Sequence, residues 1–182
     1  DNMNESEYQV WLSGVVQECL RVSKGLVWVN HKIRFRDKEA LHPARFLDFP
    51  IYSEVIWSRG TSMVLNAKKF APSHEYIFGF GKPHFWNNKT NTMFSVWEIS
   101  KEKTKSENRT FNHPCPFPLE IPLRCINASC PPGGIVLDPF AGTGTTLRAA
   151  KELGMISIGM EKEKRFCTDI QNKLQQMTFF ED

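Results

Sequence analysis

The stretch IVLDPFAGTGTT, residues 135–146, decides the fold that we expect from this sequence. Its first three residues are aliphatic, which is typical of a buried parallel strand. The two glycines that follow predict a turn leading into a helix over residues 145–153. Residues 156–160 then predict a second strand and residues 163–177 a final helix. This order predicts a βαβ unit, and therefore an α/β fold.

Length and composition exclude several classes of protein. The 182 residues are 41% hydrophobic and 24% charged, which excludes a disordered or collagen-like chain. No apolar run approaches the roughly 20 residues that cross a bilayer, so we expect a cytoplasmic protein with no membrane partner. The five cysteines lack zinc-site spacing, so we expect reduced thiols and no metal. A net charge of +3 permits nucleic-acid binding without requiring it.

The rest of the chain predicts a single domain over residues 1–182. Its halves are residues 1–100 and 113–182, joined by a hydrophilic, exposed loop at 101–112. Asn4 and Glu7 form a capping-box pattern at the start of an amphipathic helix, which we expect to end at the left-handed turn of Gly25. The other expected elements are strands at 26–29, 52–57, 75–80 and 96–99, a loop or irregular helix at 32–50, and a helix from 119 to 128.

The glycine-rich turn lies where a strand becomes a helix, which is where ligands bind in doubly wound sheets. Asp138 ends that strand and can accept from an ammonium group or a hydroxyl. The amides that begin the next helix suit a carboxylate or a phosphate. Glu161, at the tip of the second strand, is placed to reach the hydroxyls of a ribose. A ligand with an ammonium, a carboxylate and a ribose fits this set best, and S-adenosylmethionine has all three.

Two other nucleotide-binding motifs fit less well. A P-loop needs a lysine after its last glycine, and Thr145 follows Gly144 here. A dinucleotide fingerprint needs a small residue at the place that Leu147 occupies. We therefore expect neither motif.

Several segments resemble those of DNA amino-methyltransferases, specifically the β class. The residues DPFAGTGTT at 138–146 and ISIGMEKEKRF at 156–166 resemble that family's cofactor motifs. HPCPFP at 113–118 is similar to the proline-rich segment that precedes them in the β class. Weaker matches occur at EVIWSRG (54–60), SHEYIFGF (73–80) and VWEI (96–99). The resemblance follows the family's order over nearly the whole chain.

This resemblance implies a Rossmann-like methyltransferase sheet with helices on both faces. It implies a site-specific enzyme that moves a methyl group from S-adenosylmethionine to the exocyclic amino group of adenine or cytosine in double-stranded DNA. The target base must leave the stack to be reached. By the same analogy, Glu161 would hold the ribose, and Phe117 and Pro118 would pack on the other side of the cofactor. The remaining expected cofactor residues are Asp138, Pro139, Phe140, Ala141, Gly142, Gly144 and Thr145.

The sequence departs from the family at the catalytic motif. That motif is Pro-Pro-aromatic preceded by Asp, Asn or Ser, and none occurs here, since the only paired prolines lie in SCPPG at 129–133. In the β class the motif lies shortly before a helix like the one expected at 4–22. We therefore expect it, with an interior strand of the sheet, upstream of Asp1, in a sequence that does not begin with Met.

The missing strand leaves two functional hypotheses. In the first, the chain is part of an active methyltransferase whose catalytic strand comes from a preceding segment, another chain or a second copy. In the second, it is a non-catalytic or split module that binds S-adenosylmethionine or DNA and needs a partner. Arg59, Lys68 and Lys69 are candidate phosphate contacts, although a solvated basic loop accounts for them equally well.

Overall fold

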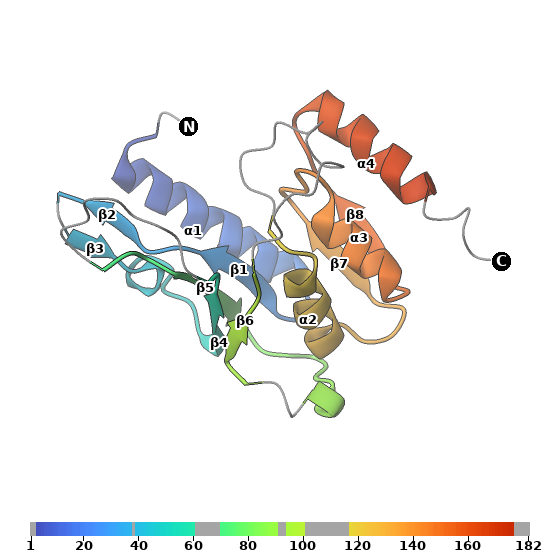
Figure 1. Cartoon of the computed structure of the whole chain (residues 1–182), viewed down its shortest axis with the longest axis horizontal. Coiled ribbons are helices and arrows are strands. Elements are labelled where there is room, and N and C mark those ends of the chain that lie inside the picture. Colours follow the sequence, from blue (N-terminus) through green and yellow to red (C-terminus); the bar gives the residue numbers. More distant parts are fainter. Residues whose placement is uncertain (1–2, 38, 61–69, 91–93, 101–116, 177–182) are drawn as a thin grey trace. The chain divides into compact units, whose positions relative to one another are not determined.

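The computed structural model describes residues 3–37, 39–60, 70–90, 94–100 and 117–176. The chain divides into two compact units, Asp1–Ser100 and Lys101–Asp182 (Figure 1). The loop expected at 101–112 lies outside the described residues, and the single domain expected over the whole chain stays a prediction. In the part of the chain that is described, no helix is both long and apolar enough to cross a membrane.

A four-stranded mixed sheet forms the centre of the first unit. Its strands lie in the order β1 (Val27–His31), β5 (His74–Phe80), β4 (Ile51–Ser58) and β6 (Val96–Glu98). β5 is antiparallel to both of its neighbours, and β6 is parallel to β4. The carboxyl ends of β1 and β4 therefore lie at the same edge of the sheet. The apolar side chains of helix α1 pack with those of the sheet in a core of Leu12, Val16, Leu47, Phe78 and Phe80.

The predicted capping box begins helix α1 (Glu5–Val22). The Asn4 side chain accepts from the Glu7 amide at 2.9 Å, and the Glu7 carboxylate accepts from the Asn4 amide at 3.1 Å. The predicted left-handed glycine at the other end was wrong. The helix ends at Val22 with an extended Ser23 (φ −83°, ψ 140°), whose amide donates to the Cys19 carbonyl. This cap needs no left-handed residue, so Gly25 has no special role there.

The loop or irregular helix expected at 32–50 was largely wrong. β2 (Arg34–Arg36) and β3 (Glu39–Leu41) form a two-stranded antiparallel hairpin, followed by the short 3-10 helix η1 (Pro43–Arg45). Each strand has only three residues and most of their side chains are exposed, so neither shows the roughly four to eight alternating residues that identify a half-buried strand. Asp37 makes the turn with a φ of 48°, a conformation that Asp tolerates better than most residues.

His31, the last residue of β1, is buried with only 8% of its surface exposed. Its Nδ1 lies 2.6 Å from the Lys32 carbonyl oxygen, and its Nε2 lies 2.9 Å from the Tyr8 hydroxyl. Because a carbonyl only accepts, Nδ1 carries the hydrogen and Nε2 accepts from Tyr8. Burial lowers the pKa of His31, so the ring is neutral at pH 7.

The second unit contains the predicted βαβ order. β7 (Ile135–Asp138) and β8 (Ile156–Gly159) are parallel neighbours, connected through helix α3 (Thr145–Glu152). Helix α2 (Glu120–Ser129) precedes β7, and helix α4 (Lys164–Gln176) follows β8. Ile126 of α2 packs with Ala149 and Ala150 of α3 against Val136 and Met155. One face of the two strands is thereby covered and half-buried.

The opposite face of β7 and β8 exposes aliphatic side chains. Parallel strands are usually buried on both faces, which makes this exposure unusual. The exposed fractions are 63% for Ile135, 38% for Leu137, 58% for Ile156 and 48% for Ile158.

Candidate functional site

The glycine-rich loop is tied to the carboxyl ends of both strands of the second unit. The Met160 amide donates to the Asp138 carbonyl, and the Ala141 amide donates to the Met160 carbonyl, both at 2.9 Å. These two bonds continue the pairing of β7 and β8 past the last residue of each strand. The loop therefore lies directly beside the residues that follow β8 (Figure 1).

The Glu161 carboxylate joins this loop to the start of helix α4. One of its oxygens accepts from the Gly142 amide and the other from the Glu163 amide, each at 2.9 Å. A carboxylate oxygen has more than one lone pair, so each can accept a further hydrogen bond. The side chain expected to hold a ribose thus also shapes the loop beside it.

Asp138 shapes the other end of the same loop. Its Oδ1 accepts from the Phe140 amide at 2.9 Å, which is a local turn of the kind that Asp often forms. Phe140 is 55% exposed. A negatively charged carboxylate at the end of β7 can accept from an ammonium group of a ligand.

Glycine is required at two places in this region. Gly144 has a φ of 82°, and a Cβ there would lie 2.9 Å from the side chain of Ile170. A Cβ on Gly159, in β8, would lie 2.6 Å from Leu147 and 3.1 Å from the Cβ of Ala141. The loop, α3 and α4 therefore approach one another too closely for larger residues.

Helix α3 begins at this loop without a side-chain cap. Its N-cap is Gly144, whose carbonyl accepts from the Arg148 amide at 2.9 Å. The amides of the first turn need acceptors, and a carboxylate or phosphate supplies them. The site therefore offers an acceptor for an ammonium group, donors for a carboxylate, and an acceptor for a hydroxyl.

The other residues predicted for this site belong to two separate parts of the chain. Pro139, Ala141 and Thr145 are in the loop or the first turn of α3, and the Thr145 hydroxyl lies 3.4 Å from that of Thr143. Phe117 and the buried Pro118 precede α2, where the Pro118 carbonyl accepts from the Ile121 amide at 3.1 Å. Their predicted contact with a cofactor stays a prediction.

Arg59, predicted as a candidate phosphate contact, is engaged within the first unit. Its guanidinium forms an ion pair with Glu75 at 2.8 Å and donates to the Pro72 carbonyl at 2.9 Å. Its side chain is only 18% exposed. Lys68 and Lys69 lie outside the described residues.

The sequence did not reveal which apolar side chains pack against the glycine-rich loop. Leu147 of α3 and Ile170 of α4 pack with Ala141 in one cluster, to which Leu174 adds. The spacing of Phe166, Ile170 and Leu174 is helical and could have indicated this apolar face. Within the described ranges, no group of three or more His, Cys, Asp or Glu could hold a metal ion.

A family model described as DNA methylase, of the N6 and N4 type, matches residues 1–172. The chain belongs to this DNA methylase family. The Type II methyltransferase M.HinfI of Haemophilus influenzae is 31% identical over 192 residues, covering 95% of this chain and 52% of that protein. The Type II methyltransferase M.BglII of Bacillus subtilis is 27% identical over 199 residues, covering 88% of this chain and 55% of that protein. This DNA methylase chain thus spans about half the length of these relatives.

Solved structures confirm the predicted α/β methyltransferase fold. The PvuII DNA methyltransferase, which is cytosine-N4-specific, has a TM-score of 0.81 at 15% identity over 93% of this chain and 71% of that one. A putative DNA modification methylase from Thermus thermophilus, complexed with S-adenosylmethionine, has a TM-score of 0.67 at 22% identity, covering 94% and 78%. The complex of M1.HpyAVI with the same ligand has a TM-score of 0.57 at 27% identity, covering 72% and 67%.

Proposed function

We propose that this DNA methylase is part of a DNA amino-methyltransferase that uses S-adenosylmethionine as its methyl donor. The substrate would be double-stranded DNA, and the acceptor the exocyclic amino group of adenine or cytosine. The observation that carries the proposal is the loop between Asp138 and Gly144, which the Glu161 carboxylate holds by the Gly142 amide. Membership of the family and the names of the relatives support it.

The residues of the site fit this cofactor by their chemistry. The Asp138 carboxylate would accept from the ammonium group, and the first-turn amides of α3 would donate to the carboxylate. Glu161 would accept from the ribose hydroxyls, since a carboxylate oxygen can accept more than one hydrogen bond. When bound, the cofactor supplies an electrophilic methyl group. The protein's contribution is to hold that methyl group in a fixed place relative to the base.

The target base would be turned out of the duplex to reach the methyl group. In the family, a Pro-Pro-aromatic motif then holds the amino group, and residues 1–182 contain no such motif. We propose that residues outside this range, or a second chain, supply it. The available edge of β7 supports this proposal: in the described part of the chain β7 pairs only with β8, and its aliphatic face is exposed. The expected cytoplasmic location stays a prediction.

An added strand can be tested by amide hydrogen exchange on β7 in the purified protein, with its oligomeric state measured by sedimentation. Protection of the amides along the outer edge of β7 would support a paired strand. Free exchange along that edge, in both monomer and oligomer, would argue against it.

Calorimetry with variants of Asp138 tests the cofactor site. Asp138→Ala removes the charge and the bond to the Phe140 amide, whereas Asp138→Asn keeps an oxygen for that amide and removes only the charge. A hydrogen bond to a charged group is worth about 1.5–3 kcal/mol, so both variants should bind S-adenosylmethionine roughly ten- to 150-fold more weakly. Unchanged affinity in both variants would refute the placement of the ammonium group.

Transfer of labelled methyl groups to duplex DNA separates the enzyme from the non-catalytic module. The absence of the catalytic motif from these 182 residues is the observation that favours the module. Labelled DNA after incubation with the full-length protein would support the enzyme. Binding of S-adenosylmethionine without transfer, by the full-length protein on mixed-sequence DNA, would support the module.

A further inference from the structure

We infer that Arg59 is a positioning residue that clasps the two ends of the β4–β5 connection, and that it does not contact DNA phosphates. The inference rests on the proposed function, because it assumes that DNA is the substrate. It replaces the role expected from the sequence, in which Arg59 was a candidate phosphate contact.

Three hydrogen bonds make the clasp. The Arg59 amide donates to the Ser73 carbonyl at 2.8 Å. One terminal nitrogen of the guanidinium donates to the Glu75 carboxylate at 2.8 Å, and the other donates to the Pro72 carbonyl at 2.9 Å. One residue at the end of β4 thus binds three residues around the start of β5.

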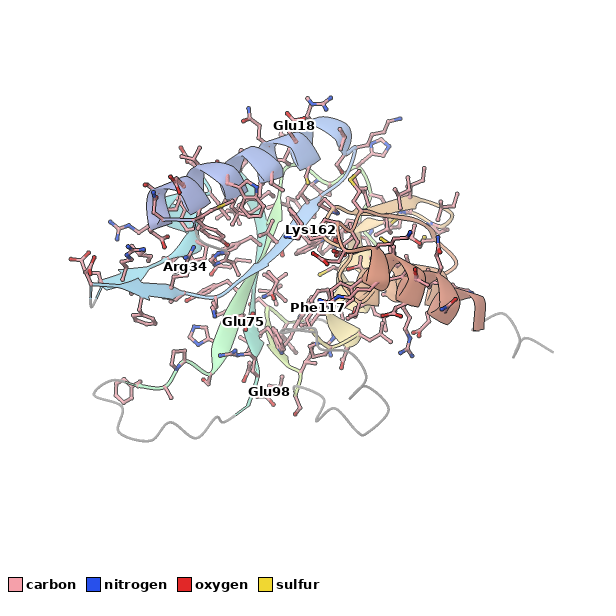
Figure 2. The ribbon with its side chains drawn as sticks, turned by 90° about the horizontal axis from the view of Figure 1, so that it is seen from above. Glu18, Arg34, Glu75, Glu98, Phe117 and Lys162 are labelled. Carbon is pink, nitrogen blue, oxygen red and sulfur yellow. The ribbon has the colours of Figure 1, made fainter. Side chains whose placement is uncertain are left out.

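The register of the sheet explains why these side chains meet. Ser58 pairs with His74 and Trp57 with Glu75, so Arg59 lies one residue beyond the last pair. Residues 59 and 75 are diagonal neighbours on the same face, a relation in which long side chains reach each other. Glu75 lies on β5 (Figure 2).

Burial makes the pair difficult to separate. The side chains of Arg59 and Glu75 are only 18% and 15% exposed. If Arg59 turned to a phosphate, the Glu75 carboxylate would be left poorly solvated and without its partner, which is strongly unfavourable. The pair is also neutral as a whole, so it adds little attraction for DNA.

The end of β4 is a rigid support for this clasp. The ring nitrogen of Trp57 donates to the Ile99 carbonyl at 2.7 Å, and the Ile99 amide donates to the Ser58 carbonyl at 3.2 Å. Trp57 itself is 2% exposed. The clasp lies at the edge of the sheet where β1 and β4 both end.

The salt dependence of DNA binding distinguishes a clasp from a phosphate contact. The logarithm of the DNA-binding constant falls linearly with the logarithm of the salt concentration, and each phosphate contact makes this slope steeper by about 0.9. The experiment measures the affinity of the full-length protein for a mixed-sequence 30-base-pair duplex, over a series of salt concentrations. The variants are Arg59→Gln, Glu75→Gln, the double variant and Arg59→Lys. Lys24→Gln, an exposed charge before the amino end of β1, serves as the matched control for losing one positive charge.

If Arg59 is a clasp, removing either partner should weaken DNA binding about five- to tenfold, within the range of coupling between residues of one ion-pair network, with an unchanged salt slope. The double variant should be no weaker than the single ones, because they break the same pair. Arg59→Lys should recover only part of the affinity, since one ammonium cannot reach both Glu75 and Pro72 in the same geometry. Affinity for S-adenosylmethionine should change little in Glu75→Gln and Arg59→Lys, because each variant keeps a hydrogen-bonding group at the pair and the cofactor residues lie in the second unit.

A phosphate contact would give opposite results. Glu75→Gln would release Arg59 and tighten DNA binding. Arg59→Gln would make the salt slope less steep by about 0.9. Either result overturns the inference, and so does unchanged affinity in both variants. If Arg59→Gln fails to fold, Glu75→Gln and Arg59→Lys carry the test. Absence of any DNA binding by the unmodified protein would instead refute the proposed function.

Discussion

Replacing Gly159 with alanine should destabilise the second unit, because the added methyl group has no space. Its Cβ would lie 2.6 Å from a methyl carbon of Leu147 and 3.1 Å from the Cβ of Ala141. Leu147 is 6% exposed and packs with Ala141 and Ile170, so it cannot move away without disturbing that cluster. Overpacking of this kind costs about 1–3 kcal/mol. We expect a loss of unfolding free energy in that range.

Gly14→Ala is the matched control, because it adds the same methyl group in a different environment. Gly14 lies within α1, and a Cβ there would meet nothing within 4 Å. Alanine in a helix is favoured over glycine by roughly 0.5–1 kcal/mol. The same substitution should therefore stabilise the first unit and destabilise the second.

Urea unfolding, monitored through the amide hydrogen exchange of α1 and of β8, measures the two effects separately. The steric explanation also predicts that Gly159→Ala costs less in a Leu147→Ala background, where the nearest methyl carbon is gone. A loss below about 0.5 kcal/mol for Gly159→Ala, within the usual range for a harmless substitution, would refute the reasoning. An identical cost in the Leu147→Ala background would show that the contact is not its cause.

Two further predictions concern titratable groups. Burial lowers the pKa of His31, so the unfolded chain takes up a proton at a higher pH than the folded chain does; unfolding free energy should therefore fall as pH drops below about 6.5. His31→Gln, which keeps an acceptor for the Tyr8 hydroxyl but cannot titrate, should reduce this dependence in urea titrations at pH 5 to 8, and an unchanged profile would count against it. Burial raises the pKa of Cys125 to about 12, so in the native protein it should react with a thiol reagent much more slowly than Cys19, as measured by peptide mass spectrometry. Equal rates would contradict the burial of Cys125.

Local sequence signals predicted much of the fold. The capping box places the start of α1, and the aliphatic run and glycines of 135–146 predict β7, the loop and α3 in the right order. These features depend on neighbours in the sequence, so a pattern reveals them. The hairpin of β2 and β3 was missed because each strand has only three residues and most of their side chains are exposed, which is too short a run for a strand pattern to be recognised.

The details of the candidate site depended on contacts that a sequence does not contain. Asp138 and Glu161 were identified from their places at strand ends, but the bond from the Gly142 amide to Glu161 depends on how β7 and β8 pair. Arg59 was expected to be exposed and able to contact a phosphate, because it begins a polar, basic stretch of sequence. Its actual partner, Glu75, lies sixteen residues away and is reached only through the register of β4 and β5.

The double use of Glu161 has an evolutionary consequence. Its carboxylate holds two backbone amides of the protein itself, so selection for a stable fold would retain it even in a lineage that no longer transferred methyl groups. The presence of this glutamate in a relative is therefore weak evidence that the relative transfers methyl groups. Residues that make no contact within the protein would be lost sooner once activity ceased, and they are the better place to look for a methylase that has become a binding module.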